Sequence, residues 1–176
     1  TGIFMKEVRI RHFRCLRSVD VELDPLTVLI GQNNSGKTSF LNALFAAIGA
    51  GQRVISNDDI FLHKSEVSAP KSRAVAIDIL IRPTDDQGQI TDVFPQGSAW
   101  LELWGLGVVQ DENDRDLVAV RTLLKWNAIK GEYALERRFL KDWQADSAKW
   151  EDSKPVERVA PVSAQQIEPL ALYLLD

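Results

Sequence analysis

The feature that most constrains this chain is a glycine-rich loop with a fixed order of residues. Residues 31–38 read Gly-Gln-Asn-Asn-Ser-Gly-Lys-Thr, which fits the pattern G-x-x-x-x-G-K-[ST] at every fixed position. Four such positions recur by chance in well under ~1% of chains of this length. A short apolar run, Leu26 to Ile30, precedes the loop, and an amphipathic pattern follows it. The sequence therefore predicts a P-loop, or Walker A motif, between a buried strand and a helix.

The residue types in this loop suit the binding of nucleotide phosphates. Gly31 permits a tight turn out of the strand, and Gly36 lets the backbone approach a phosphate without a Cβ clash. The backbone N–H groups of the loop and the N-terminus of the following helix together form a nest for anionic oxygens. Lys37 would place its charge near the β- and γ-phosphates, and the Thr38 hydroxyl suits Mg²⁺. The weaker alternative is a glycine-containing turn with a solvated lysine.

These positions define the predicted site. The residues predicted to bind the nucleotide are Gly31, Gln32, Asn33, Asn34, Ser35, Gly36, Lys37, Thr38 and Ser39. Lys37 is the candidate catalytic residue and Thr38 the candidate metal ligand. The expected ligands are ATP and Mg²⁺, and the lack of an evident guanine-reading motif favours ATP over GTP.

Hydrophobic periodicity predicts an α/β chain. Residues 5–23 alternate as two short strands, and the apolar residues after the loop lie on one face of a helix: Phe40, Leu41, Leu44, Phe45 and Ile48. Residues 50–72 are predicted to be loop with a short helix. Alternation then predicts four strands, around 75–81, 100–104, 118–126 and 133–139, and short connections favour an antiparallel meander.

The C-terminal part is predicted to be less regular. Residues 141–162 are polar and contain two prolines, which indicates a linker or an exposed loop. Ser163 could cap a final helix over 163–176, although Pro169 interrupts that pattern. The predicted organisation is one domain over 1–176, with a P-loop core at 5–50 and antiparallel strands at 73–140.

Composition excludes several classes of function. The chain has 176 residues, 45% hydrophobic and 26% charged, as in ordinary soluble globular domains. No apolar run approaches the roughly 18 residues of a membrane span, and no signal core is present at the N-terminus. A single cysteine, Cys15, argues against a disulfide framework and favours a cytoplasmic location. The net charge of −4 excludes a whole-domain basic field for nucleic acid.

The residues before and within the loop resemble one branch of P-loop proteins. The stretch from Met5 to Arg14 is similar to the first strand and Phe-Arg element of ABC-type ATPase heads of the SMC/RecF group. The loop from Gly31 to Ser39 is similar to that of OLD-family ATP-dependent endonucleases. The resemblance is specific over residues 5–48 and architectural over 73–140. It implies a P-loop NTPase fold, with an ABC-ATPase-like first lobe that combines a mixed sheet and an antiparallel β-meander.

The resemblance adds Arg14 to the predicted site. Arg14 aligns with an arginine that reaches the nucleotide in such heads. It also belongs to a basic run that could contact DNA phosphates instead, comprising Lys6, Arg9, Arg11, Arg14 and Arg17.

Parts of the family pattern are not found in the sequence. No Leu-Ser-Gly-Gly-like signature occurs, and the terminal Leu172 to Asp176 only superficially resembles the strand that bears the catalytic carboxylates. The expectation is therefore an incomplete head, the N-terminal lobe of a larger ATPase. Its partner would be a second head in a homodimer, DNA contacts would come from absent segments, and no membrane partner is expected.

Several other residues carry weaker signals. Asp58 and Asp59 could lie near a metal but are more often surface or helix-cap residues. His12 and His63 show no metal-ligand spacing. Two alternatives to the ATPase head remain, namely a small P-loop phosphotransferase and a non-catalytic nucleotide-sensing module.

Overall fold

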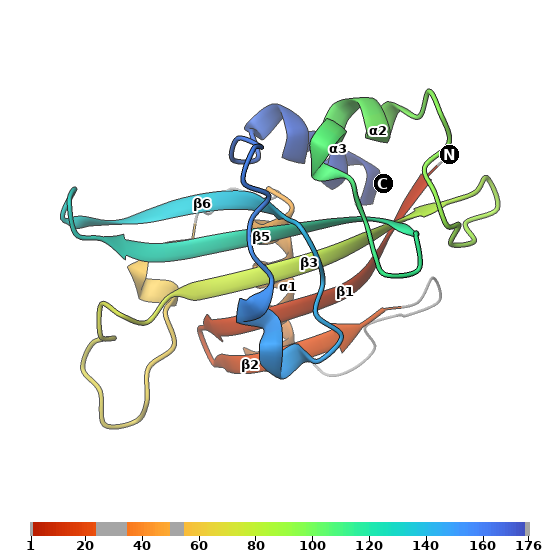
Figure 1. Ribbon diagram of the computed structural model, residues 1–176. Coiled ribbons are helices and arrows are strands. Elements are labelled where there is room, and N and C mark those ends of the chain that lie inside the picture. Colours follow the sequence, from red (N-terminus) through yellow and green to blue (C-terminus); the bar gives the residue numbers. More distant parts are fainter. Residues whose placement is uncertain (1, 24–34, 50–54, 175–176) are drawn as a thin grey trace.

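A computed structural model describes residues 2–23, 35–49 and 55–174 (Figure 1). The elements are β1 (Gly2–Phe13), β2 (Leu16–Glu22), α1 (Ser35–Ala47), η1 (Asn57–Asp59), β3 (Val75–Thr84), α2 (Ala99–Trp104), η2 (Gly105–Gly107), β4 (Val109–Gln110), β5 (Asp116–Asn127), β6 (Glu132–Leu140), η3 (Ser147–Asp152) and α3 (Ala164–Leu174).

The described strands form one antiparallel sheet. Its order is β2-β1-β3-β5, with both β4 and β6 paired to β5, so β1 lies between β2 and β3 although β2 precedes β3 in the chain. The predicted antiparallel strands at 75–81, 118–126 and 133–139 are confirmed. The predicted strand at 26–30 lies outside the described residues.

The register places the apolar residues of neighbouring strands on one face. Ile10 pairs with Ile77, Ile79 pairs with Val120, and Val120 pairs with Phe139. All of these side chains are buried. Alternation along each strand therefore produces the main hydrophobic core on one side of the sheet.

Helix α1 packs against this apolar face. The predicted helix is confirmed, but its buried face is centred on small residues: Ala43 and Ala47 are fully buried, with Phe40 and Ile48 beside them. Leu41 and Phe45, which were predicted to face the core, are only half-buried. Buried alanines let a helix approach a sheet closely.

The segment around 100–104 was predicted to be a strand, and this prediction is wrong. Residues Ala99–Trp104 form helix α2. An alternating Trp-x-x-x-Trp pattern also satisfies the i, i+4 spacing of a helix. In this helix Trp100 and Trp104 stack with ring centroids 4.8 Å apart. Trp104 is buried, and its indole Nε1 donates to the carbonyl of Gln166 in the first turn of α3.

The second face of the sheet carries charged residues, and a segment from the C-terminal part covers it. We call residues 142–153 the strap. Arg9 stacks on Trp143 at 4.3 Å, and Arg121 stacks on Trp150 at 4.9 Å. The strap runs across the front of the sheet in Figure 1, on the side opposite α1. Part of the region expected to be a polar linker or exposed loop thus packs on the sheet.

The last helix is also part of the domain. Ser163 caps it: the backbone N–H of Gln166 donates to the Ser163 hydroxyl at 3.3 Å, and Ser163 N–H donates to the Gln166 side chain at 3.0 Å. Ile167 and Leu170 are buried in the main core. None of the helices in the described ranges has the length and apolar character needed to span a bilayer.

Candidate nucleotide-binding site

The described part of the candidate site is the first turn of α1. The helix begins at Ser35, so the P-loop pattern ends inside it, as the sequence predicted. Lys37 is half-buried, Thr38 is exposed and Ser39 is buried. Residues 31–34, with Gly31, Gln32, Asn33 and Asn34, lie outside the described residues.

The side chains at this helix start are compatible with a bound phosphate and Mg²⁺. The first turn of α1 contains no acidic residue that would repel an anion. The exposed hydroxyl of Thr38 is a hard oxygen donor of the type that Mg²⁺ prefers. Among the described residues no group of three or more His, Cys, Asp or Glu side chains could hold a metal. A single hydroxyl donor is compatible with Mg²⁺, which usually keeps several water ligands and binds substrate phosphates.

The turn between β1 and β2, which carries Arg14, contacts helix α1 at Ser39. The thiol of Cys15 lies 3.5 Å from the hydroxyl of Ser39. Both His12, with φ 59°, and Arg14, with φ 51°, have left-handed backbone. Non-glycine residues rarely adopt this conformation unless their surroundings hold them in it.

The contacts that hold Arg14 come from η1. Its backbone N–H donates to the carbonyl of Asp59 at 2.6 Å, and its Nε donates to Asp59 Oδ1 at 2.9 Å. The Asp59 side chain also accepts from the backbone N–H of Ser56, and Ser56 accepts from the N–H of Asp58, which together form a capping box. The helix-cap interpretation is confirmed for Asp59, and Asp58 is an exposed residue beside it. Sequence reasoning missed that Asp59 also pairs with Arg14.

The two histidines have local structural contacts. His12 Nδ1 lies 3.2 Å from the carbonyl of Ala74, and the His63 ring packs edge-on against Phe61 at 5.1 Å.

Most of the basic run is engaged within the fold. Arg9 and Arg11 are 3% and 6% exposed, respectively. Arg11 donates to both carboxylate oxygens of Asp20 and to the carbonyl of Ser147 in the strap. Burial raises the pKa of the Asp20 carboxyl, but hydrogen bonds from Arg11 and Ser147 outweigh it, so this pKa lies below its usual range. The suggestion that the whole run contacts DNA phosphates is therefore wrong for Arg9 and Arg11.

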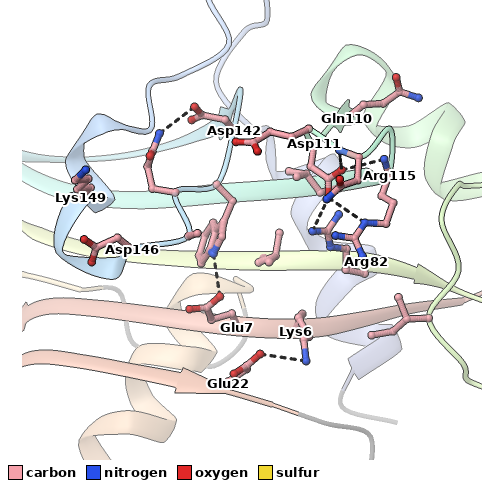
Figure 2. A pocket seen from close by; sticks show the side chains of 18 residues that line it. Lys6, Glu7, Glu22, Arg82, Gln110, Asp111, Arg115, Asp142, Asp146 and Lys149 are labelled. Atoms are coloured by element: carbon pink, nitrogen blue, oxygen red, sulfur yellow. Dashed lines mark hydrogen bonds and ion pairs between the residues drawn. The ribbon is translucent and has the colours of Figure 1, made fainter.

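A groove of about 740 Å³ lies on the strap side of the sheet, opposite α1. Figure 2 shows its charged walls: Lys6 faces Glu22, and Arg82 and Arg115 both face Asp111. Acidic side chains outnumber basic ones in its lining. A net acidic lining disfavours the binding of phosphate in this groove. The candidate nucleotide site therefore lies on the α1 side of the sheet.

Comparisons with known proteins identify the family of this chain. A family model described as an AAA ATPase domain matches residues 4–161. An OLD nuclease from Thermus scotoductus is 40% identical over 45 residues, a stretch that covers 26% of this chain and 8% of that protein. The resemblance to the OLD family is therefore confirmed over this stretch, and the family match implies a P-loop NTPase fold. The chain belongs to the AAA ATPase domain family.

Proposed function

We propose that this chain is the ATP-binding N-terminal lobe of an ABC-type ATPase head. The single observation that carries the proposal is the family match over 4–161, which includes a complete P-loop pattern ending in the first turn of α1. The local match to an OLD nuclease supports a parent protein that is an OLD-like ATP-dependent endonuclease. A RecF-like DNA-maintenance protein is the related possibility within the same group.

In this proposal the residues of the chain bind and orient the triphosphate. The N–H groups that open α1 would donate to phosphate oxygens, and Lys37 would neutralise charge at the β- and γ-phosphates. The Thr38 hydroxyl would hold Mg²⁺, which supplies charge stabilisation to the transferred phosphoryl group when bound. The contact of Cys15 with Ser39 fixes the β1–β2 turn beside this helix.

We further propose that a second head completes the site. ATP would then favour the dimer, because the ligand contacts both surfaces only in that state. This chain alone would bind ATP weakly and hydrolyse it poorly.

Lys37 is the residue of the proposed site with the most direct role in phosphate binding. We expect Lys37→Ala to weaken ATP binding about 10- to 100-fold, since a charge-assisted contact with phosphate is lost. Isothermal titration with Mg-ATP measures the change. Lys64→Ala, which removes an exposed lysine elsewhere, is the matched control and should leave the affinity unchanged. Equal affinity of the wild-type protein and the Lys37 variant would contradict the proposed site.

Two further measurements test the proposed dimer and the proposed endonuclease activity separately. Light scattering with and without ATP, on a longer chain that includes the rest of the head, tests nucleotide-dependent dimerisation. Magnesium-dependent DNA cleavage by that longer protein tests the endonuclease assignment. Rapid ATP turnover by the present chain alone, lost in Lys37→Ala, would contradict the dependence on a second head.

A further inference from the structure

The Asp59 side chain is held by burial and by a contact with Ser56 in addition to its contact with Arg14. It is 3% exposed, and its Oδ2 accepts from the backbone N–H of Ser56 at 2.9 Å. Its other oxygen, Oδ1, accepts from Arg14 Nε at 2.9 Å. The backbone adds a second link, from the Arg14 N–H to the Asp59 carbonyl at 2.6 Å. Asp59 is therefore a fixed point to which Arg14 is attached twice, once through the carboxylate and once through the backbone carbonyl.

The turn that carries Arg14 is also fixed on its other sides. Phe13 pairs with Ile60 in a β-bridge, and Cys15 contacts the buried hydroxyl of Ser39 in α1. The chain thus connects η1 to the P-loop helix through three consecutive residues. Arg14 is the central one, and it is held in left-handed backbone.

The guanidinium of Arg14 retains most of its donors. An arginine has five N–H groups, and Asp59 takes only the one on Nε. The structure records no hydrogen bond from Nη1 or Nη2 to any residue in 2–23, 35–49 or 55–174. The side chain is 25% exposed, and its two terminal nitrogens carry the other four donors in a planar fork. Such a planar fork matches the oxygens of a phosphate.

We propose that Asp59 is a positioning residue that orients the Arg14 guanidinium toward the phosphates of a nucleotide bound at the start of α1. This inference rests on the proposed function, because it requires a nucleotide at that helix. Its physical basis is preorganisation: an arginine already fixed by a buried carboxylate loses less rotamer freedom when it binds an anion. Asp59 itself does not contact the nucleotide.

Nucleotide affinities of four proteins test this inference. They are the wild type, Arg14→Asn, Asp59→Asn and the double variant, each titrated with Mg-ATP. Asparagine tolerates left-handed backbone, so Arg14→Asn removes the guanidinium with little change in the turn. We expect Arg14→Asn to weaken ATP binding about 10-fold or more. Asp59→Asn should weaken it about 3- to 10-fold, because the arginine is no longer fixed.

The double variant provides the decisive measurement. If Asp59 acts through Arg14, Asp59→Asn has no further effect once Arg14 is replaced, so the double variant binds like Arg14→Asn. A purely structural role for Asp59 predicts a lower melting temperature with unchanged affinity, or losses that multiply. Either result would overturn the inference.

Control variants separate this inference from the proposed function. Glu66→Gln breaks a second arginine–carboxylate pair in the same loop and should leave ATP affinity unchanged. Wild-type affinity in Arg14→Asn, together with lost binding in Lys37→Ala, would overturn the inference and leave the proposed function standing. Undiminished binding in Lys37→Ala would overturn both. Should Asp59→Asn fail to fold, Asp59→Glu keeps the charge, displaces the carboxylate and is expected to weaken binding in the same way.

Discussion

His12 and Arg14 illustrate how single residues are held in unfavourable backbone. Left-handed conformation costs a non-glycine residue on the order of 1–3 kcal/mol. Both residues make hydrogen bonds that keep them there: the His12 carbonyl accepts from the Phe61 N–H, and the Arg14 N–H donates to Asp59. The strain therefore coincides with the turn that contacts the P-loop helix.

A buried arginine–carboxylate pair on the second sheet face holds the strap in place. Arg121 donates to both oxygens of Asp78, which is 2% exposed. Burial raises the pKa of Asp78, because the low-dielectric interior disfavours the charged form, and the Arg121 guanidinium offsets part of this rise. Arg121 also donates to the carbonyls of Trp150 and Ser153, so this pair attaches the strap to the sheet.

Glu66 gives a prediction of pH dependence. Hydrogen bonds from Arg73 and from the His63 backbone lower its pKa from 4.5 to about 2. A carboxyl whose pKa is lower in the folded state stabilises that state above the unfolded pKa and loses this effect as the pH falls through the folded pKa. We expect Glu66→Gln to be less stable than wild type at pH 7, with the difference shrinking between about pH 4.5 and pH 2.

Urea unfolding at several pH values checks this expectation. Glu157→Gln, at an exposed site, is the control and should show no such trend. A difference between wild type and Glu66→Gln that is the same at pH 2 and pH 7 would contradict it.

At the scale of elements, the strap determines whether the second sheet face is covered. The face carries Arg9, Arg11 and Arg121, and these residues donate to strap carbonyls while their guanidinium groups lie over strap tryptophans. Trp150 is central, because the Arg11 and Arg121 guanidinium carbons lie 5.7 and 4.9 Å from its ring. Each partly desolvated contact of this kind contributes about 1–2 kcal/mol.

We therefore expect Trp150→Ala to loosen the strap while the sheet remains folded. The predicted cost is about 2 kcal/mol, with faster amide exchange in residues 147–153 than in β6. Exchange measured by mass spectrometry resolves the two regions. Trp126→Ala removes a tryptophan that stacks on Lys71 at 4.1 Å, outside the strap, and should leave strap exchange unchanged. Unaltered strap exchange in Trp150→Ala would show that the stacking contributes little.

At the scale of the whole molecule, α1, α2 and α3 cover the apolar sheet face and the strap covers the charged one (Figure 1). Residues far apart in sequence share the main core, including Ile3 from β1 and Leu170 from α3. The last helix is thus part of the same folding unit as the P-loop helix.

Two leucines in α3 test whether this helix unfolds together with the rest of the domain. Leu170 is fully buried, whereas Leu172 is 65% exposed. We expect Leu170→Ala to lower the free energy of unfolding by about 2–5 kcal/mol in one cooperative transition. Leu172→Ala should cost less than about 0.5 kcal/mol. Similar losses in both variants, or a separate transition for α3, would contradict the single folding unit.

The sequence alone determined the features that depend on local order. Period-2 alternation located the strands around 75–81, 118–126 and 133–139, and the glycine–lysine pattern located the start of α1, because both signals are contained in neighbouring residues. The cap at Ser163 could be predicted for the same reason.

Features that depend on residues far away in the chain could not be predicted from local patterns. The segment from Trp100 to Trp104 fits both a strand and a helix by its pattern, and packing against Phe94 and α3 selects the helix. The strap is polar in sequence, yet it packs on the sheet because arginines more than 100 residues away complement its carbonyls and tryptophans. The pairing of Arg14 with Asp59, separated by 45 residues, likewise follows from the fold.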